Sequence, residues 1–463
     1  MPKQLIKEKG KVFRDPVHRL VRIDRVDQFI LDLINTPEVQ RLRRVRQLGV
    51  SSLTYHGAEH SRFSHSLGVF NFSQRIISAL CRRYGNDHRV SQLLIEHSRV
   101  IKAAALLHDL GHGPFSHMLE NVKSLKFSHE RVTSKLILNS RVSEVLKSHN
   151  IKPDEVSAVI SGTYPFRLAV DIVSSQLDAD RMDYLLRDSL MTGVEYGVYD
   201  AEWLLNAMCV GKDPGSSTTP LDVENSWRLC IDRDRGLHSA EQLILARHHM
   251  MLQVYMHRVT RGYEIMLLGL FTHLAQLAKQ NSLPASTPSV ISKYFVGGVD
   301  ALGADWLHFD ESSLVSAIQG WASNTDPGFE AFAEAARAFL NRERLFFGAR
   351  LATRLQDIRD LSNGLTEKGL VEWQDWALDN GEHLPYKGVY YGGSVGSAEE
   401  EEQSTLSILV SSGDPDQKGK AVEHDSTILK NLDNQAQGIR RLYVKRSRVS
   451  EAKPVLDRFN IKI

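Results

Sequence analysis

Cysteine is scarce in this sequence of 463 residues. The three cysteines, Cys81, Cys209 and Cys230, form no CxxC pair, which excludes a disulfide scaffold and a thiolate zinc site. No apolar run approaches the roughly 18 residues that a membrane helix needs. The basic N-terminus also lacks the apolar stretch of a secretory signal. We therefore expect a cytoplasmic protein that does not enter a membrane.

An excess of charge of either sign is also missing. The sequence has 57 Lys and Arg residues against 56 Asp and Glu residues, which gives a formal net charge of +1. Duplex binding normally requires a basic stripe, so this balance speaks mildly against nucleic acid and leaves that partner open. Without cysteine ligands, a bound metal has to use histidine and carboxylate side chains, and 19 histidines are present.

Apolar residues recur at helical spacing through most of the first 280 residues. Thr36-Pro37 is typical of a helix start between two short helices in 26–49. Further helices are predicted at 62–84, 98–109, 129–149, 154–161, 171–190, 200–209 and 237–279. The class is therefore mainly α, with a core over residues 1–280.

Strand-like segments are expected to be scarce before residue 385 and limited to short pieces such as KVFRDP near the start. Near the end of the chain, LSILVSS and IRRLYVKRSRV alternate as strands do. We therefore predict a C-terminal accessory region over residues 281–463 that contains a small β element.

The segment ALLHDLGHGPFSHMLE at 105–120 carries the clearest chemistry. It combines His108, Asp109, His112, His117 and Glu120 with glycines that permit close backbone approach. A lone histidine on an apolar face is usually a core residue. Three imidazoles and two carboxylates within so short a stretch are costly to bury unless a cation or a substrate uses them.

The adjacent His108 and Asp109 supply only two ligands, so others must come from elsewhere. Candidates are His65 in RFSHSLGV and Asp180 in SSQLDADRMDYLLRD. The alternative for Asp180 and Asp183 is a solvated acidic helix face that pairs with its own arginines.

Six motifs then occur in the order of one known family. They are DPVH at 15–18, TPEVQRLRRVRQLG at 36–49, HSRFSHSLGV at 60–69, HDLGHGPFSH at 108–117, FSHE at 127–130 and DADRMDYLLRD at 178–188. Together they resemble the HD-domain deoxynucleoside triphosphate (dNTP) triphosphohydrolases, which include bacterial dGTPases and a vertebrate enzyme with a sterile-alpha-motif domain. The resemblance covers about residues 11–270 and implies an HD-domain helical core with its motif region at 60–190.

The resemblance implies a metal site and a catalytic group. The metal ligands would be His65, His108, Asp109 and Asp180, with Mn, Fe, Zn or Ni as the ion and Mg accompanying the substrate triphosphate. The catalytic residues would be His112, His117, Glu120 and His129. Because His117 and Glu120 are three residues apart, the carboxylate can fix the imidazole tautomer.

The resemblance also implies substrate contacts. Arg62, Arg181 and Arg247 match basic positions that contact phosphate, although Arg181 replaces a lysine of the family. Gln47 and Leu48 match residues beside the deoxyribose, where a packed side chain can exclude a 2′-hydroxyl. Asp188 matches an acid near the sugar. Tyr184 and Tyr255 are candidates for the aromatic walls of the substrate site.

A regulatory nucleotide is a further expectation of the resemblance. Arg14, Asn35, Gln40 and Arg43 match a pocket between subunits, so a homo-oligomer, from dimer to hexamer, is expected. Asn35 replaces an aspartate that reads guanine in the vertebrate relative, and Arg14 replaces a smaller polar residue. The identity of an activating nucleotide is therefore open.

Three functions remain for test. The first is metal-dependent hydrolysis of dNTPs to deoxynucleoside and triphosphate, whether for nucleotide balance or for defence against phage. The second is an HD phosphodiesterase or nuclease, and the third is a nucleotide sensor without turnover. The complete set of expected ligands, together with the His117 and Glu120 pair, favours the first.

Overall fold

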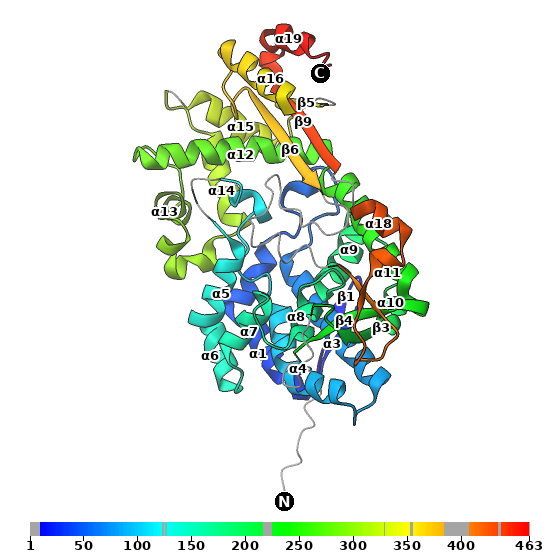
Figure 1. Cartoon of the computed structure of the whole chain (residues 1–463). Helices are drawn as coiled ribbons and strands as arrows, with labels where there is room; N and C mark the ends of the chain where they lie inside the picture. Colours follow the sequence, from blue (N-terminus) through cyan, green and yellow to red (C-terminus); the bar gives the residue numbers. More distant parts are fainter. Residues whose placement is uncertain are drawn as a thin grey trace, which may run out of the picture.

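The computed structural model describes residues 10–122, 125, 127–215, 225–327, 329–351, 355–383, 407–433 and 437–462. In these residues the chain is mainly helical, as predicted, with small sheets around the helices (Figure 1). The hairpin of β1 (Lys11–Asp15) and β2 (Arg19–Ile23) comes first. The predicted helix pair follows as α1 (Gln28–Ile34) and α2 (Pro37–Arg41), and Thr36 caps α2.

Two long helices, α3 (Arg62–Tyr84) and α4 (Arg89–Leu107), pack along each other in the centre of the core. Gly85 ends α3 with a φ of 80°, a conformation that favours glycine. His88 then caps α4 by accepting the N–H of Val90. The buried faces of these helices belong to the largest hydrophobic cluster of the molecule.

Shorter helices surround this pair. They are α5 (His129–Asn139), α6 (Arg141–Ser148), α7 (Pro153–Ile160), α8 (Arg167–Val173), α9 (Ala179–Thr192) and α10 (Ala201–Ala207). Asp178 starts α9 by accepting the N–H of Arg181 at 2.6 Å. Because α9 packs against α3, the first turn of α9 comes to lie beside the HSRFSHSLGV motif.

The sequence predicts one helix over 237–279, but the structure has two. α11 (Arg233–Met250) runs into a π-helical turn (Met251–Tyr255), and α12 (Arg258–Lys279) begins after His257. The side chain of His257 accepts the N–H of Val259 and so caps the new helix. A π turn holds an additional residue, and here Met251 and Tyr255 both line the cavity described below.

The expectation that strands are scarce before residue 385 is wrong. β3 (Met208–Lys212), β4 (Trp227–Asp232), β5 (Phe346–Arg350) and β6 (Trp376–His383) all precede that point. Every residue of β4 is buried, so it lacks the alternation of polar and apolar residues by which a half-exposed strand is recognised.

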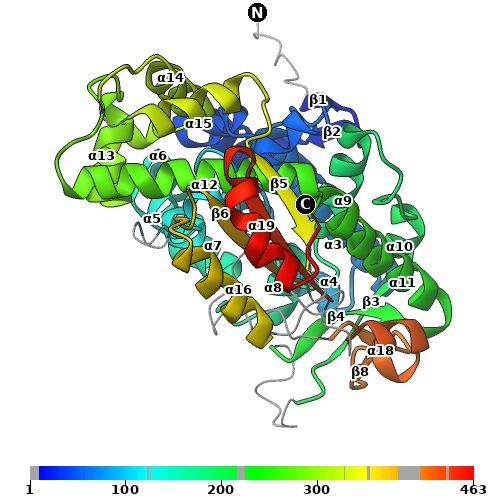
Figure 2. The same ribbon diagram turned by 90° about the horizontal axis from the view of Figure 1, so that it is seen from above.

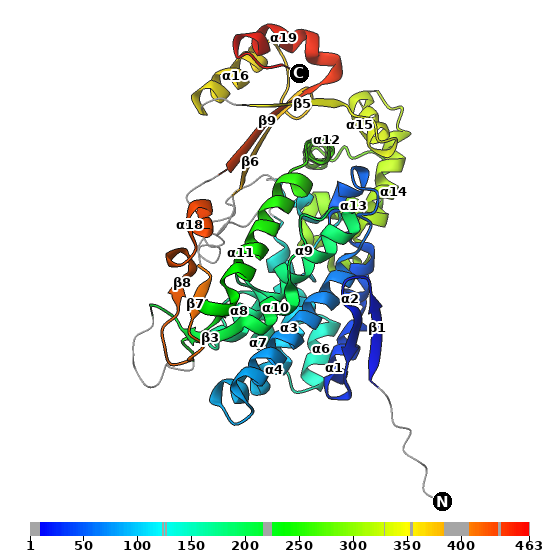
Figure 3. The ribbon, with the colours of Figure 1, turned by 90° about the vertical axis from the view of Figure 1, so that its right-hand side faces the viewer.

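The predicted strands near the C-terminus are present and complete two sheets. β7 (Leu409–Ser411) pairs in parallel with β4, and β8 (Lys420–Ala421) follows it, in the order β3-β4-β7-β8. β9 (Gln437–Lys445) lies between β5 and β6. Figure 3 shows the N-terminal hairpin and the β3-β4-β7-β8 sheet on opposite sides of the helical core.

Most of the C-terminal region packs onto α12, whereas α18 lies against α11. Its helices are α13 (Ser289–Gly297), α14 (Glu311–Ala322), α15 (Glu330–Leu340), α16 (Leu355–Glu367), α18 (Thr427–Asp433) and α19 (Val449–Arg458). α16 and α19 lie over the β5-β9-β6 sheet (Figure 2). A second hydrophobic cluster joins Phe115 and Met118 of the core to Tyr294 and Trp321 of this region. None of the described helices is long and apolar enough to cross a membrane.

Candidate active site

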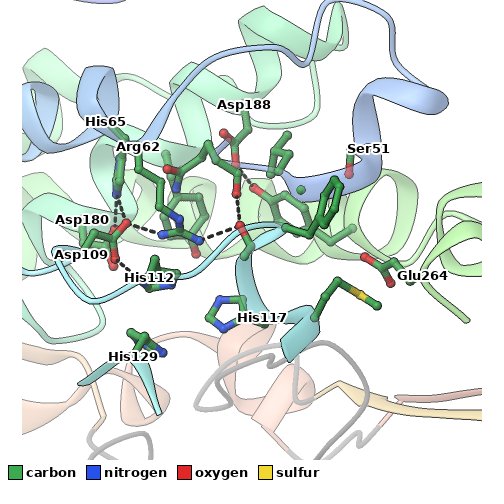
Figure 4. A pocket seen from close by; sticks show the side chains of 18 of the residues that line it. Ser51, Arg62, His65, Asp109, His112, His117, His129, Asp180, Asp188 and Glu264 are labelled. Atoms are coloured by element: carbon green, nitrogen blue, oxygen red, sulfur yellow. Dashed lines mark hydrogen bonds and ion pairs between the residues drawn. The ribbon is translucent and has the colours of Figure 1, made fainter. Parts of the chain in front are cut away.

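The four predicted metal ligands meet where three helices come together (Figure 4). His65 is on α3, His108 and Asp109 follow the last turn of α4, and Asp180 is in the first turn of α9. His65 Nε2 lies 3.0 Å from Asp180 Oδ1 and 3.8 Å from Asp109 Oδ2. His108 Nε2 lies 3.4 Å from Asp109 Oδ1 and 3.7 Å from Asp180 Oδ1. Two imidazole nitrogens and two carboxylates therefore face one small volume.

Each imidazole of this cluster is held through its other ring nitrogen. His108 Nδ1 donates to the carbonyl of Ala105 at 3.0 Å, so Nε2 carries the lone pair, and that buried atom has no hydrogen-bond partner. His65 Nδ1 lies 2.8 Å from Asp183 Oδ2. A carbonyl or carboxylate behind the imidazole is usual for metal-binding histidines. The donor set and the unpaired nitrogen fit a divalent first-row cation.

Asp183 connects this cluster to the N-terminal motif. His18 Nε2 lies 2.6 Å from Asp183 Oδ1, and Arg187 donates to Asp183 Oδ2 at 2.8 Å and to Asp15 Oδ2 at 2.9 Å. Asp183 is fully buried, so the alternative of a solvated acidic face does not hold for it. Sequence reasoning gave Asp183 no role, although its place three residues after Asp180 was an available signal.

The electrostatics of the cluster favour positive charge. Burial disfavours a protonated His65, but Asp180 and Asp183 outweigh it and raise the pKa of His65 to about 10. Burial likewise opposes ionisation of Asp109, yet the Arg62 guanidinium and the nearby imidazoles hold its pKa below the usual value. A cation between the carboxylates would supply the charge that the proton on His65 otherwise provides.

A second group of imidazoles lies next to the first. The ring centroid of His112 is 5.0 Å from that of His117 and 4.0 Å from that of His129. Glu120 joins two of these rings, because its Oε2 lies 2.6 Å from His117 Nδ1 and its Oε1 lies 2.6 Å from His129 Nδ1. One carboxylate thus orients both imidazoles, as the spacing of His117 and Glu120 predicts.

Protonation differs among these groups. Burial and the Arg62 charge lower the pKa of His112 well below its usual value, so His112 is neutral. Burial opposes both the charge on Glu120 and that on His129, but their mutual attraction lowers the pKa of Glu120 and raises that of His129. The neutral His112 therefore lies beside the Glu120–His129 pair, in which the carboxylate favours the protonated form of the imidazole. Such an arrangement is suited to proton transfer.

The loop between His112 and His117 is conformationally strained. Phe115 and Ser116 have φ values of 56° and 55°, in the left-handed region. Glu311 of α14 stabilises this loop, since its Oε1 accepts the N–H of Phe115 at 3.0 Å and that of Arg46 at 2.9 Å. The buried Arg41 donates to the carbonyl of His112 at 2.8 Å.

Arg41 extends this support into the C-terminal region. It donates to the carbonyl of Phe309 from Nε at 3.1 Å, and its guanidinium lies 4.1 Å from the centroid of the Trp306 ring. The contacts of Arg41 and Glu311 with the loop were not foreseen, because nothing local in the sequence links residues so far apart.

The loop of residues 109–119, called the catalytic loop below after the predicted role of His112 and His117, borders a cavity of about 250 Å³. All eight predicted substrate contacts line it, as do His65, Asp109, Asp180, His112, His117 and His129. The substrate contacts comprise Gln47, Leu48, Arg62, Arg181, Tyr184, Asp188, Arg247 and Tyr255.

The arginines of the cavity stand near the metal cluster and are already oriented. Arg62 donates to Asp109 and, at 2.9 Å, to Ser116 Oγ. Arg181 pairs with Asp178, and Arg247 donates to Gln176 at 3.1 Å. Burial and the nearby Arg181 lower the pKa of Arg247, and an anion placed between these guanidiniums would relieve that repulsion.

Asp188 is more constrained than the sequence suggests. Its Oδ1 lies 2.8 Å from His60 Nε2, and its Oδ2 accepts the hydroxyl of Tyr255 at 2.7 Å. His60 was not foreseen, although it opens the HSRFSHSLGV motif. Together these contacts fix one wall of the cavity between α9 and the π turn.

The four residues predicted to bind a regulatory nucleotide lie outside this cavity. Arg14 is exposed on β1, and Asn35 is exposed at the end of α1. Gln40 donates to the carbonyl of Ile34 at 2.7 Å and accepts from Arg43 at 2.8 Å. Their assignment to a nucleotide site remains a prediction.

A family model for the HD domain matches residues 62–188, which hold both histidine groups. The uncharacterized protein YwfO of Bacillus subtilis is 34% identical over 94% of this chain and 92% of its own length. The chain belongs to the HD-domain family.

Two further comparisons, one of sequence and one of structure, concern relatives of this HD-domain protein. The deoxynucleoside triphosphate triphosphohydrolase SAMHD1 homolog of Dictyostelium discoideum is 30% identical over 59% of this chain, which spans 51% of that relative. The crystal structure of a phosphohydrolase from Bacteroides thetaiotaomicron superposes with a TM-score of 0.71 at 24% identity, covering 94% of this chain and 99% of the other. The structural likeness supports the fold over the C-terminal region as well.

Proposed function

We propose that this HD phosphohydrolase cleaves deoxynucleoside triphosphates into deoxynucleoside and inorganic triphosphate. One observation carries the proposal: a single cavity is lined by three members of the donor cluster (His65, Asp109 and Asp180), by the imidazole of His117 and by the guanidiniums of Arg62, Arg181 and Arg247. A compact array of cations beside metal ligands suits a polyanionic phosphate chain. The relative named as a dNTP triphosphohydrolase supports the choice of substrate.

His65, His108, Asp109 and Asp180 would hold the divalent metal. Mn²⁺ or Fe²⁺ suits such a mixed set of imidazole and carboxylate, Zn²⁺ and Ni²⁺ are the other choices, and Mg²⁺ would accompany the triphosphate. When bound, the ion supplies positive charge and an electrophilic centre beside the first phosphate. Asp183 and the Ala105 carbonyl keep the two imidazoles in the tautomer that binding requires.

The remaining residues position the substrate and move protons. Water adds to the first phosphorus, the bond from that phosphorus to the 5′-oxygen breaks, and the 5′-oxygen takes up a proton. His117, oriented by Glu120, delivers that proton, while His112, which is neutral, and His129, which Glu120 also contacts, complete the wall of the reaction site. The arginines hold the departing triphosphate.

Gln47 and Leu48 would exclude ribonucleotides. Both line the cavity, and the carbonyl of Gln47 accepts the hydroxyl of Ser116 at 2.9 Å, which fixes this wall against the catalytic loop. A side chain packed where a 2′-hydroxyl projects rejects ribose by collision. Tyr184, Asp188 and Tyr255 would close the opposite side of the sugar site.

The test is product identification by chromatography. The protein, loaded with Mn²⁺ and supplied with Mg²⁺, is incubated with each dNTP and NTP, separately and in mixtures, because an activating nucleotide can differ from the substrate. We expect deoxynucleoside and intact triphosphate from dNTPs only. Asp109→Ala, which removes an anionic ligand, should lose both bound metal and turnover.

Other outcomes would contradict the proposal. Release of pyrophosphate or of single phosphates would refute the site of cleavage. Cleavage of an oligonucleotide in place of dNTPs would indicate a phosphodiesterase or nuclease. Nucleotide binding without any product would indicate a sensor.

A further inference from the structure

The cavity has a second polar end, away from the phosphate-binding arginines. In Figure 4, Ser51 and Glu264 lie on the side of the cavity opposite Asp109 and His65. Ser51 is 4% exposed, and its hydroxyl makes no hydrogen bond with any described residue. Glu264 comes from α12, whose start is set by the π turn. Neither residue takes part in the proposed chemistry.

Glu264 has a structural role that leaves part of its carboxylate free. Arg261 donates to Glu264 Oε2, whereas Oε1 accepts no hydrogen bond from the described residues. Arg261 does not depend on this contact, because it also donates to Asp379 from Nε at 3.1 Å and from Nη2 at 2.7 Å. The Glu264 side chain is 20% exposed, and it is exposed into the cavity that it lines.

A nucleotide has only one orientation that suits both ends of this cavity. A nucleotide with its phosphates beside Arg62 and the metal ligands would extend its base toward Ser51 and Glu264 at the other side of the cavity. Methionine and aromatic side chains of the lining provide apolar surface for the faces of the base, and the two polar groups meet its edge.

We propose that Glu264, with Ser51, reads the base and selects guanine. A carboxylate only accepts hydrogen bonds. Guanine offers two adjacent donors, N1–H and the N2 amino group, to one carboxylate. Adenine places an unprotonated N1 at the same point, and cytosine and thymine each offer a single donor. The Ser51 hydroxyl is free to donate to an acceptor of the base.

This inference rests on the proposed function, because the phosphate end sets the orientation of the nucleotide. A hydrogen bond to a charged group is worth roughly 1.5–3 kcal/mol, which corresponds to a preference of about 10- to 100-fold. We therefore expect kcat/KM for dGTP to exceed that for dATP by at least about tenfold. dITP, which lacks the N2 amino group, should fall between them.

The experiment compares wild type with Glu264→Gln and with Glu343→Gln, an exposed acid outside this cavity. Glu264→Gln should reduce the dGTP to dATP ratio by about tenfold or more, whereas Glu343→Gln should keep the wild-type ratio. Equal use of dGTP, dITP and dATP by wild type would overturn the inference without any variant. An unchanged ratio in folded Glu264→Gln would overturn it as well.

Calorimetric binding of dGTP and dATP separates this inference from the proposed function. Guanine-selective binding that is lost in Glu264→Gln, without release of triphosphate, would support the base site and refute the hydrolase. Triphosphate release with no dependence on base or on Glu264 would support the hydrolase and refute the base site. Failure to bind any nucleotide would refute both.

Discussion

Glu311 links the C-terminal region to the catalytic loop, and its removal should have a measurable cost. The Glu311→Ala change leaves the buried N–H of Phe115 and the half-buried N–H of Arg46 without an acceptor. An unpaired buried donor costs about 1–3 kcal/mol and a half-buried one costs less, so the expected loss is about 1–4 kcal/mol. Glu311→Gln keeps the acceptor oxygen and should lose much less.

Wild type should also differ from both variants in its pH dependence, because only wild type carries an ionisable group at position 311. Burial is the main cause that raises the pKa of Glu311 to about 7, from a usual value of 4.5, and Arg41 and the backbone hydrogen bonds oppose it only in part. The folded protein therefore binds a proton here that the unfolded chain releases. The proton bound to Glu311 stabilises the folded protein. Its contribution to the free energy of unfolding is complete below pH 4.5 and is lost as the pH rises through about 7.

The magnitude follows from the two pKa values and is up to about 3 kcal/mol. Urea unfolding, followed by tryptophan fluorescence between about pH 5 and pH 8.5, measures it as the difference between wild type and Glu311→Gln. As the pH rises, the stability of Glu311→Gln relative to wild type should increase, because the glutamine side chain carries no charge to bury. Hydrogen exchange of the 109–119 segment should increase in Glu311→Ala only. A pH-independent difference, or equal behaviour of Ala and Gln, would refute this reasoning.

Three further predictions concern the site and the assembly. Asp183→Asn should weaken metal binding by roughly 10- to 100-fold, measured by chelator competition on the folded variant, and an unchanged affinity would remove Asp183 from the support of His65. His117→Ala should lower kcat by roughly a hundredfold or more with bound metal retained, and an unchanged kcat at saturating substrate would make His117 structural. Light scattering should show a homo-oligomer stabilised by nucleotide, by roughly 2.7 kcal/mol per site at a hundred times Kd, and a monomer under all conditions would contradict the oligomer and the pocket formed by Arg14, Asn35, Gln40 and Arg43.

Much of the core could be predicted because its signals are local. Helical spacing located α3, the second half of α4 and most of α9, although the predicted helix at 171–190 runs across the break between α8 and α9. The motifs on these helices contain the residues that meet at the metal cluster. The pairing of His117 with Glu120 also follows from a spacing of three residues. These inferences need only the periodicity of a helix and the chemistry of the side chains.

The parts that were missed depend on contacts between distant segments. β4 is buried on both faces, so its pattern resembles that of a buried helix. The break after α11 comes from a π turn within an otherwise helical apolar pattern. Glu311 acts on backbone groups 196 and 265 residues away, and the identity of those residues carries no trace of the contact.

The bonds between Arg41 and the C-terminal region have an evolutionary consequence. Arg41 binds the carbonyl of Phe309, a group that every amino acid possesses. This hydrogen bond therefore does not depend on which side chain stands at position 309, provided that the backbone follows the same path, although the buried Phe309 ring also packs in the core. Position 311 is different, because only a side chain that accepts hydrogen bonds serves there. At these two positions the C-terminal region thus holds the strained loop in different ways, by a backbone carbonyl at 309 and by a side-chain acceptor at 311.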